Sequence, residues 1–209
     1  MKQLLAILAL LIASTLSAQL TPRSAFTTAP ISVLPAIAEP TRLDMIDYFE
    51  SGINRPSKTI FEGDAVLTAL DDNIASISIG DYQQIDIVVL PYGNKAIIMI
   101  IDHLKTPDTT STIRFYNSRW EQFDTDKMLR LPTLKDWTGK IDKNLRIDLE
   151  NALPFIMYDA KYDPATKILT LKPETQGYVA IENHDLVDSN LKPELKYRWT
   201  GKKFASYNP

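Results

Sequence analysis

The sequence contains no cysteine. This absence excludes disulfide bonds, cysteine nucleophiles, zinc sites with thiolate ligands and a lipid anchor on an N-terminal cysteine. Histidine is almost as scarce: the chain has only His103 and His184, which are not one helical turn apart as a helical metal site requires. We therefore predict no metal site, no cofactor and no catalytic residue, and a fold that depends on packing alone.

An excess of basic residues is also lacking. Lysine and arginine number 23 against 26 aspartates and glutamates, for a formal net charge of −3. The basic residues are scattered along the chain, without the concentrated positive face that phosphate contacts require. No nucleic-acid partner is therefore predicted.

Long apolar runs are absent except at the start of the chain. Met1 to Ala18 places Lys2 before an apolar run from Leu4 to Leu16 and ends in small residues, as secretory signal peptides do. The run has about 13 residues, fewer than the ~20 that a membrane span needs. We predict cleavage near Ala18, no membrane span in the mature chain, and a periplasmic or secreted protein. A cysteine-free exported chain is more typical of bacteria than of eukaryotes.

The sequence predicts three segments. Residues 1–18 form the signal peptide, and residues 19–38, rich in Thr, Ala and Pro, form an extended N-terminal arm. The apolar residues Val33, Leu34 and Ile37 of this arm are expected to dock on the core. Residues 39–209 form a single domain.

The stretch from Thr41 to Gly52 allows two interpretations, a pair of catalytic carboxylates or an amphipathic helix. Asp44 and Asp47 lie one helical turn apart, but Thr41 is a good N-cap and Asp44 is placed to complete a capping box. Gly52 suits the left-handed position that ends a helix. The expected apolar stripe is Leu43, Ile46 and Phe49, widened by Met45 and Tyr48. The helix is favoured.

Strand patterns dominate the rest of the chain. They predict hairpins over residues 65–79, 85–104 and 155–173 and further strands at 112–120 and 195–207. Within the second hairpin, residues 96–101 are expected to form a central strand covered on both faces. A second helix is predicted at 142–153, with a short helical turn near Trp137. The order of helix, strands, helix, strands predicts an α+β fold with a mainly antiparallel sheet. Because Trp120 and Trp199 each stand between aromatic residues, a weak internal repeat is an alternative within this fold.

Residues that carry chemistry have structural interpretations as well. Asp102 and His103 are neighbours on a strand, so their side chains point to opposite faces and do not pair. His103 is expected to be packed or capping, and His184 to lie in a solvated loop. The acidic clusters at Asp71 and Asp124 are too short for a calcium loop and suit turns. Most aromatic residues are expected in the core rather than in a ligand groove: Tyr92, Tyr116, Trp120, Trp137, Tyr197, Trp199 and Tyr207.

The order of several short motifs gives the chain a resemblance. "RLDMID" at Arg42, "IRFYNSRW" at Ile113, "DPATKILTL" at Asp163 and "YRWTGKKF" at Tyr197 together resemble a domain-of-unknown-function family of secreted proteins from Bacteroides-like bacteria. The resemblance covers nearly the whole mature chain. It implies export and a single domain, and it carries over no site residue.

These observations favour a periplasmic or cell-surface protein that is a non-enzymatic binding or structural module. Its expected partner is a protein, peptide or glycan of the cell envelope, and the sequence does not locate the binding residues. The alternative is a hydrolase or another enzyme with a dispersed acidic site that uses Asp44, Asp47 or His184. A deep pocket with several converging titratable groups would distinguish the enzyme from the binding module.

Overall fold

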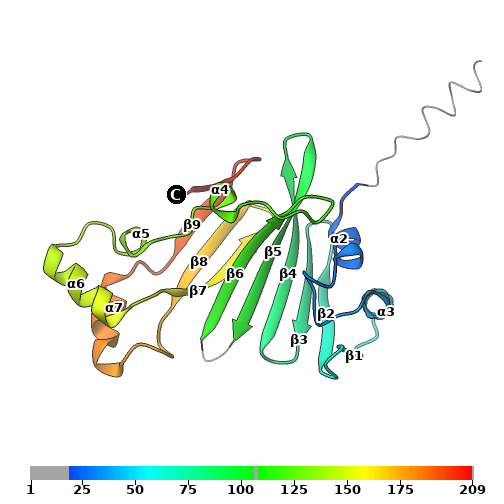
Figure 1. Cartoon of the computed structure of the whole chain (residues 1–209), viewed down its shortest axis with the longest axis horizontal. Helices are drawn as coiled ribbons and strands as arrows, with labels where there is room; N and C mark the ends of the chain where they lie inside the picture. The colour runs from blue at the N-terminus through cyan, green and yellow to red at the C-terminus, as the bar shows by residue number, and fades with distance from the viewer. Residues whose placement is uncertain (1–18, 106–107, 209) are drawn as a thin grey trace, which may run out of the picture.

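The computed structural model describes residues 19–105 and 108–208, so the predicted signal peptide lies outside the described residues. Two antiparallel sheets form the centre of the molecule (Figure 1). The larger sheet contains β1 Ser57–Lys58, β2 Asp64–Leu70, β3 Ile74–Ile79, β4 Gln83–Tyr92, β5 Lys95–Lys105 and β6 Thr109–Tyr116. The smaller sheet contains β7 Met157–Asp163, β8 Ile168–Glu174, β9 Leu195–Trp199 and β10 Phe204–Ser206. The α+β class with mainly antiparallel strands is confirmed.

In each sheet the order of the strands in space is their order in the chain. Short turns connect most of the strands, whereas η2 Ile181–Asn183 and α7 His184–Asn190 lie between β8 and β9. Between β2 and β3, for example, a carboxylate oxygen of Asp71 accepts hydrogen bonds from the backbone N–H groups of Asn73, at 2.7 Å, and Ile74, at 3.0 Å. This acidic cluster is therefore a turn, as its sequence predicts.

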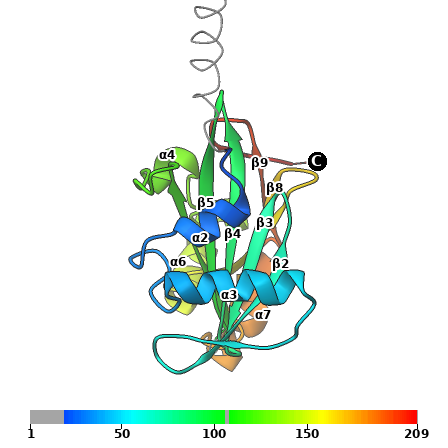
Figure 2. The ribbon, with the colours of Figure 1, turned by 90° about the vertical axis from the view of Figure 1, so that its right-hand side faces the viewer.

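Two helices lie across one face of the larger sheet, α2 Pro22–Thr28 and α3 Glu39–Glu50 (Figure 2). The prediction of an extended arm at residues 19–38 is wrong where α2 forms. Thr21 caps this helix by accepting from the N–H of Ser24 at 3.1 Å, and Pro22 occupies the first turn. Proline suits that position because its missing N–H would have no helical partner there. The predicted docking of Val33, Leu34 and Ile37 is confirmed, since all three side chains are buried.

The helix α3 differs from its prediction at its start and in its buried face. It begins at Glu39 with Pro40 in the first turn, so Thr41 lies inside the helix and is not its N-cap. The buried residues are Arg42, Met45 and Ile46, whereas Leu43 is 49% exposed. Gly52 ends the helix as predicted, with a backbone φ of 66°.

Four further helices follow β6, which the sequence predicts only in part. They are α4 Thr125–Met128, α5 Leu134–Thr138, α6 Lys143–Ala152 and α7 His184–Asn190, the last preceded by the 3₁₀ turn η2 Ile181–Asn183. The predicted second helix is α6, and the predicted turn near Trp137 is α5. Asp124 caps α4 by accepting from the N–H of Asp126 at 3.2 Å. In the described part of the chain no helix combines the length and the apolar character needed to cross a membrane.

The hydrophobic core lies on both faces of the larger sheet. On one face α2 and α3 pack against β2, β3 and β4; on the other, the inner face of the smaller sheet packs against β4, β5 and β6. The strand β5 is central: Ile97, Ile98, Met99, Ile100 and Ile101 are all buried, as the sequence predicts for a strand covered on both sides.

The two tryptophans that suggest an internal repeat occupy different local structures. Trp199 is a buried residue of β9, and its indole N–H donates to the carbonyl oxygen of Pro91 at 2.7 Å, which fixes the smaller sheet to the end of β4. Trp120 follows β6 in a turn, with a positive φ of 63°. The repeat therefore stays a prediction without local support at these residues.

Candidate functional site

A group of four polar residues joins the two sheets, and we name it the polar junction: the buried His103 and Ser111 and the half-buried Asp86 and Asp159. His103 lies near the end of β5 on the same face as Met99 and Ile101. Its Nδ1 atom lies 3.0 Å from an oxygen of Asp159 on β7, and its Nε2 atom lies 3.4 Å from an oxygen of Asp86 on β4. The longer Nε2 distance is an ion-pair contact rather than an aligned hydrogen bond.

The two carboxylates decide the charge of this histidine. Burial opposes protonation, but the hydrogen bond to Asp159 and the interactions with Asp86 outweigh it and raise the pKa of His103 to about 9. Contact with the imidazolium lowers the pKa of the Asp159 carboxyl, although burial works against the change. Burial alone would raise the pKa of Asp86, but the contact with His103 and hydrogen bonds from neighbouring side chains outweigh burial and lower it. At neutral pH the junction is an imidazolium between two carboxylates.

The junction contains the residue types of a serine hydrolase without the arrangement that catalysis needs. Ser111 Oγ lies 3.0 Å from Nδ1 of His103, but Ser111 is only 4% exposed. Its oxygen also accepts the backbone N–H of Ala160 at 2.9 Å, which connects β6 to β7. In a catalytic triad the serine and the carboxylate contact opposite nitrogens of the imidazole, whereas Ser111 and Asp159 both contact Nδ1 of His103. The junction therefore holds the two sheets together.

The other residues considered for catalysis are not brought together. Asp102 lies on the opposite face of β5 from His103, where its carboxylate accepts from Gln83 at 2.8 Å. Asp44 and Asp47 are exposed on α3. The prediction that His184 lies in a loop is wrong, because it is the first residue of α7, and its Nε2 atom lies 3.0 Å from the carbonyl oxygen of Val179. Within residues 19–105 and 108–208 no three potential metal ligands are grouped to hold an ion.

Most of the aromatic residues fill the core. Trp137 of α5 is fully buried, and Tyr116, Tyr197 and Trp199 are buried in the clusters on either face of the larger sheet. Tyr207 is partly exposed and its ring stacks under the guanidinium of Arg198, 3.8 Å from Cζ to the ring centroid. These aromatic side chains do not line a common groove.

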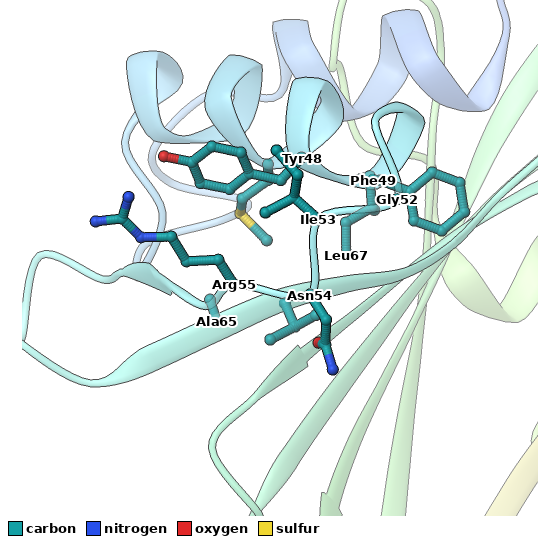
Figure 3. A pocket seen from close by; sticks show the side chains of 10 residues that line it. Tyr48, Phe49, Gly52, Ile53, Asn54, Arg55, Ala65 and Leu67 are labelled. Carbon is teal, nitrogen blue, oxygen red and sulfur yellow. The ribbon is translucent and has the colours of Figure 1, made fainter.

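A surface groove lies where the end of α3 passes over β2 (Figure 3). We name it the α3–β2 groove; its volume is about 250 Å³, and it is open to solvent on one side. It is lined by Met45, Tyr48, Phe49, Gly52, Ile53, Asn54, Arg55, Ala65, Val66 and Leu67. Most of these side chains are apolar, and the groove gathers no set of converging titratable groups.

The wall of the groove follows from the way α3 ends. The N–H of Gly52 donates to the carbonyl of Phe49 at 3.2 Å, and the N–H of Ile53 donates to that of Tyr48 at 2.9 Å. These two bonds form a Schellman motif, which reverses the chain at the left-handed Gly52. After Gly52 the chain passes over β2. The side chain of Ile53, which is 51% exposed, lies above Leu67 (Figure 3).

The floor of the groove is a sheet edge that is only partly covered. β1 pairs with Asp64 and Ala65 of β2 and goes no further. Along residues 66–70, β2 has β3 on one side and no strand on the other. In the described part of the chain no hydrogen bond outside the ladder with β3 reaches the backbone of residues 66–70. A free edge of this kind is a template for another strand.

Comparison with known proteins places the chain in a family. Comparison with curated proteins gives no match. A solved domain of an uncharacterized protein from Porphyromonas gingivalis W83 has a similar fold, with a TM-score of 0.75 and 20% sequence identity, over 88% of this chain and 97% of that one. The profile of a family described as "Protein of unknown function (DUF3256)" matches residues 13–204. The chain therefore belongs to the DUF3256 family of proteins of unknown function.

Proposed function

We propose that this protein is an exported, non-enzymatic binding module of the bacterial cell envelope and that the α3–β2 groove is its binding surface. Support for export comes from the pattern of residues 1–18, with its short apolar run and small residues before Ala18. The absence of cysteine is consistent with a bacterial periplasm or cell surface.

The observation that carries the binding role is the groove itself. Its apolar lining includes two exposed hydrophobic side chains, Phe49 at 37% and Ile53 at 51% exposure. Exposed apolar side chains gathered around a hollow mark interaction surfaces more often than scattered ones do. The charged groups of the polar junction, by contrast, face one another, and its histidine and serine are buried.

The test compares two matched variants in capture from the native envelope. Ile53→Glu puts a charge in the groove, and Ile181→Glu puts the same charge at an 84% exposed position on η2, away from the groove. Immobilised mature protein should capture a set of envelope components, Ile181→Glu should capture the same set, and Ile53→Glu should lose it. Equal capture by all three proteins would show that the groove is not the binding surface.

A further inference from the structure

The chemistry of the groove indicates which class of partner it takes. We infer that the occupant is an extended peptide segment that adds a short strand to the free edge of β2 and presents an apolar side chain to the groove and a carboxylate to Arg55. This inference rests on the proposed function, because it names the ligand of the same surface.

The free backbone of residues 66–70 is the first reason. The N–H and C=O groups that point away from β3 can form hydrogen bonds with an extended chain that lies alongside. Peptides that add a strand to a sheet edge bind in this way. The chain before β1 diverges from β2 here, since Pro56 has no N–H to continue the ladder and Arg55 turns back to donate its N–H to the carbonyl of Ile53 at 3.0 Å. The space that remains beside Val66 and Leu67 is the α3–β2 groove, which Asn54 and Arg55 also line and which can take a side chain of an added strand.

Charge complementarity is the second reason. Arg55 stands at one end of the groove with its guanidinium 5.8 Å from the centre of the Tyr48 ring (Figure 3). Among residues 19–105 and 108–208 no carboxylate lies within 4.0 Å of it, whereas Lys58 nearby is paired with Asp64. A cation that is held by an aromatic ring and lacks an acidic partner favours an acidic residue in the ligand.

The composition of the lining disfavours a glycan. A buried sugar carries several hydroxyl groups, and each costs free energy unless a protein group bonds it. Beyond the hydroxyl of Tyr48, the lining supplies only the polar side chains of Asn54 and Arg55. A peptide side chain with no polar atoms matches this lining better.

A second copy of the chain is also disfavoured. The register of β2 against β3 shifts between Leu67 and Ala69, where Thr68 forms a bulge. Bulges bend a strand and discourage long edge-to-edge pairing between folded domains. A short peptide segment pairs with only a few residues of the edge, so the bend affects it less than it affects a long strand.

The experiment selects ligands from a phage-displayed library of random linear peptides. Wild-type protein should enrich peptides with a bulky apolar residue near an aspartate or glutamate. Synthetic copies should bind Ile181→Glu as they bind the wild type and should bind Ile53→Glu about tenfold or more weakly. Arg55→Glu should select lysine or arginine in place of the acid, a charge swap that loss of folding would not produce.

Hydrogen exchange gives the readout for strand addition. A selected peptide should slow exchange at those amides of residues 66–70 that point away from β3, because an added strand bonds them. Binding that leaves these amides unchanged would overturn strand addition. Binding to an array of envelope glycans is measured in parallel, because a glycan is the alternative class of ligand.

The two proposals fail in different ways. If a glycan binds the wild type and not Ile53→Glu while the library yields no peptide, the groove is a binding site and the peptide inference is wrong. If envelope capture is insensitive to Ile53→Glu and no library peptide binds, the proposed function itself is wrong.

Discussion

The polar junction makes the stability of the protein depend on pH in the alkaline range. The ordinary pKa of histidine is 6.5, and His103 in the folded protein has a pKa of about 9. Because the folded value is the higher one, the folded state binds more protons than the unfolded state between these values. The stabilisation is therefore fully present below pH 6.5 and is lost as the pH rises through about 9.

The size of the effect follows from the shift. Each pKa unit corresponds to about 1.4 kcal/mol, so the difference between 6.5 and about 9 amounts to about 3 kcal/mol of unfolding free energy. Part of it is screened on the Asp159 side, where the side chain is 38% exposed, so we expect a measured loss of about 2–3 kcal/mol between pH 6.5 and pH 9.5.

Urea unfolding at a series of pH values from 6.5 to 9.5 measures this loss. The control His184→Gln removes the other histidine and should keep the pH dependence of the wild type. His103→Gln should be less stable at pH 6.5, since it leaves two carboxylates without their cation, and its stability should vary less with pH. If the wild type and His103→Gln lost stability in parallel, the reasoning about the junction would be refuted.

Three further predictions concern other parts of the chain. Arg42→Ala should cost about 2–4 kcal/mol in urea unfolding, because its guanidinium donates to three carbonyl oxygens at the end of α2, whereas Thr41→Ala inside α3 should change stability by less than about 0.5 kcal/mol; the opposite ranking would contradict the structure. Asp142→Ala should cost about 1 kcal/mol because Asp142 caps α6, and Asp148→Ala in the same helix should cost less than about 0.5 kcal/mol; equal losses in thermal melts would mean that capping is unimportant there. N-terminal sequencing of protein recovered from its native host should begin near Gln19, and a chain that still begins at the first methionine would contradict export.

The sheets were predictable because their signals are local. Alternating or continuous apolar residues between turn-forming residues identify the hairpins, and the turn at Asp71 and the end of α3 at Gly52 depend on side chains only a few residues away. The capping of α6 by Asp142 is local in the same way. Such features depend on neighbours in the sequence, which the sequence displays directly.

The start and the buried face of α3 were not predictable in this way, because they depend on α2. Arg42 is buried since the carbonyl groups of Phe26, Thr27 and Ala29 need a donor at the end of α2, at distances of 2.9, 3.0 and 2.6 Å. No periodicity rule places an arginine in the core. Once Arg42 turns inward, Leu43 turns toward solvent.

Long-range contacts also determine which residues meet at the candidate sites. His103 is expected from sequence to be packed or capping, but its partners Asp86 and Asp159 come from β4 and β7 and could not be named without the fold. The α3–β2 groove had one local signal, the helix end at Gly52 followed by the exposed Ile53. The point at which β1 stops covering β2 was not visible in the sequence.

The agreement between strand order and chain order has a consequence for how the protein acquires its structure. Each strand pair joins neighbours in the chain, and within the larger sheet the connecting loops are short, so each of its hairpins can form as soon as it is complete. The contacts with the largest loop-closure entropy form late, because they join residues far apart in the chain. Trp199 and Pro91 are 108 residues apart, and His103 and Asp159 are 56 apart. We therefore expect that a chain synthesised from its N-terminus assembles the larger sheet first. The second face of β5 becomes buried only when the strands of the smaller sheet are added.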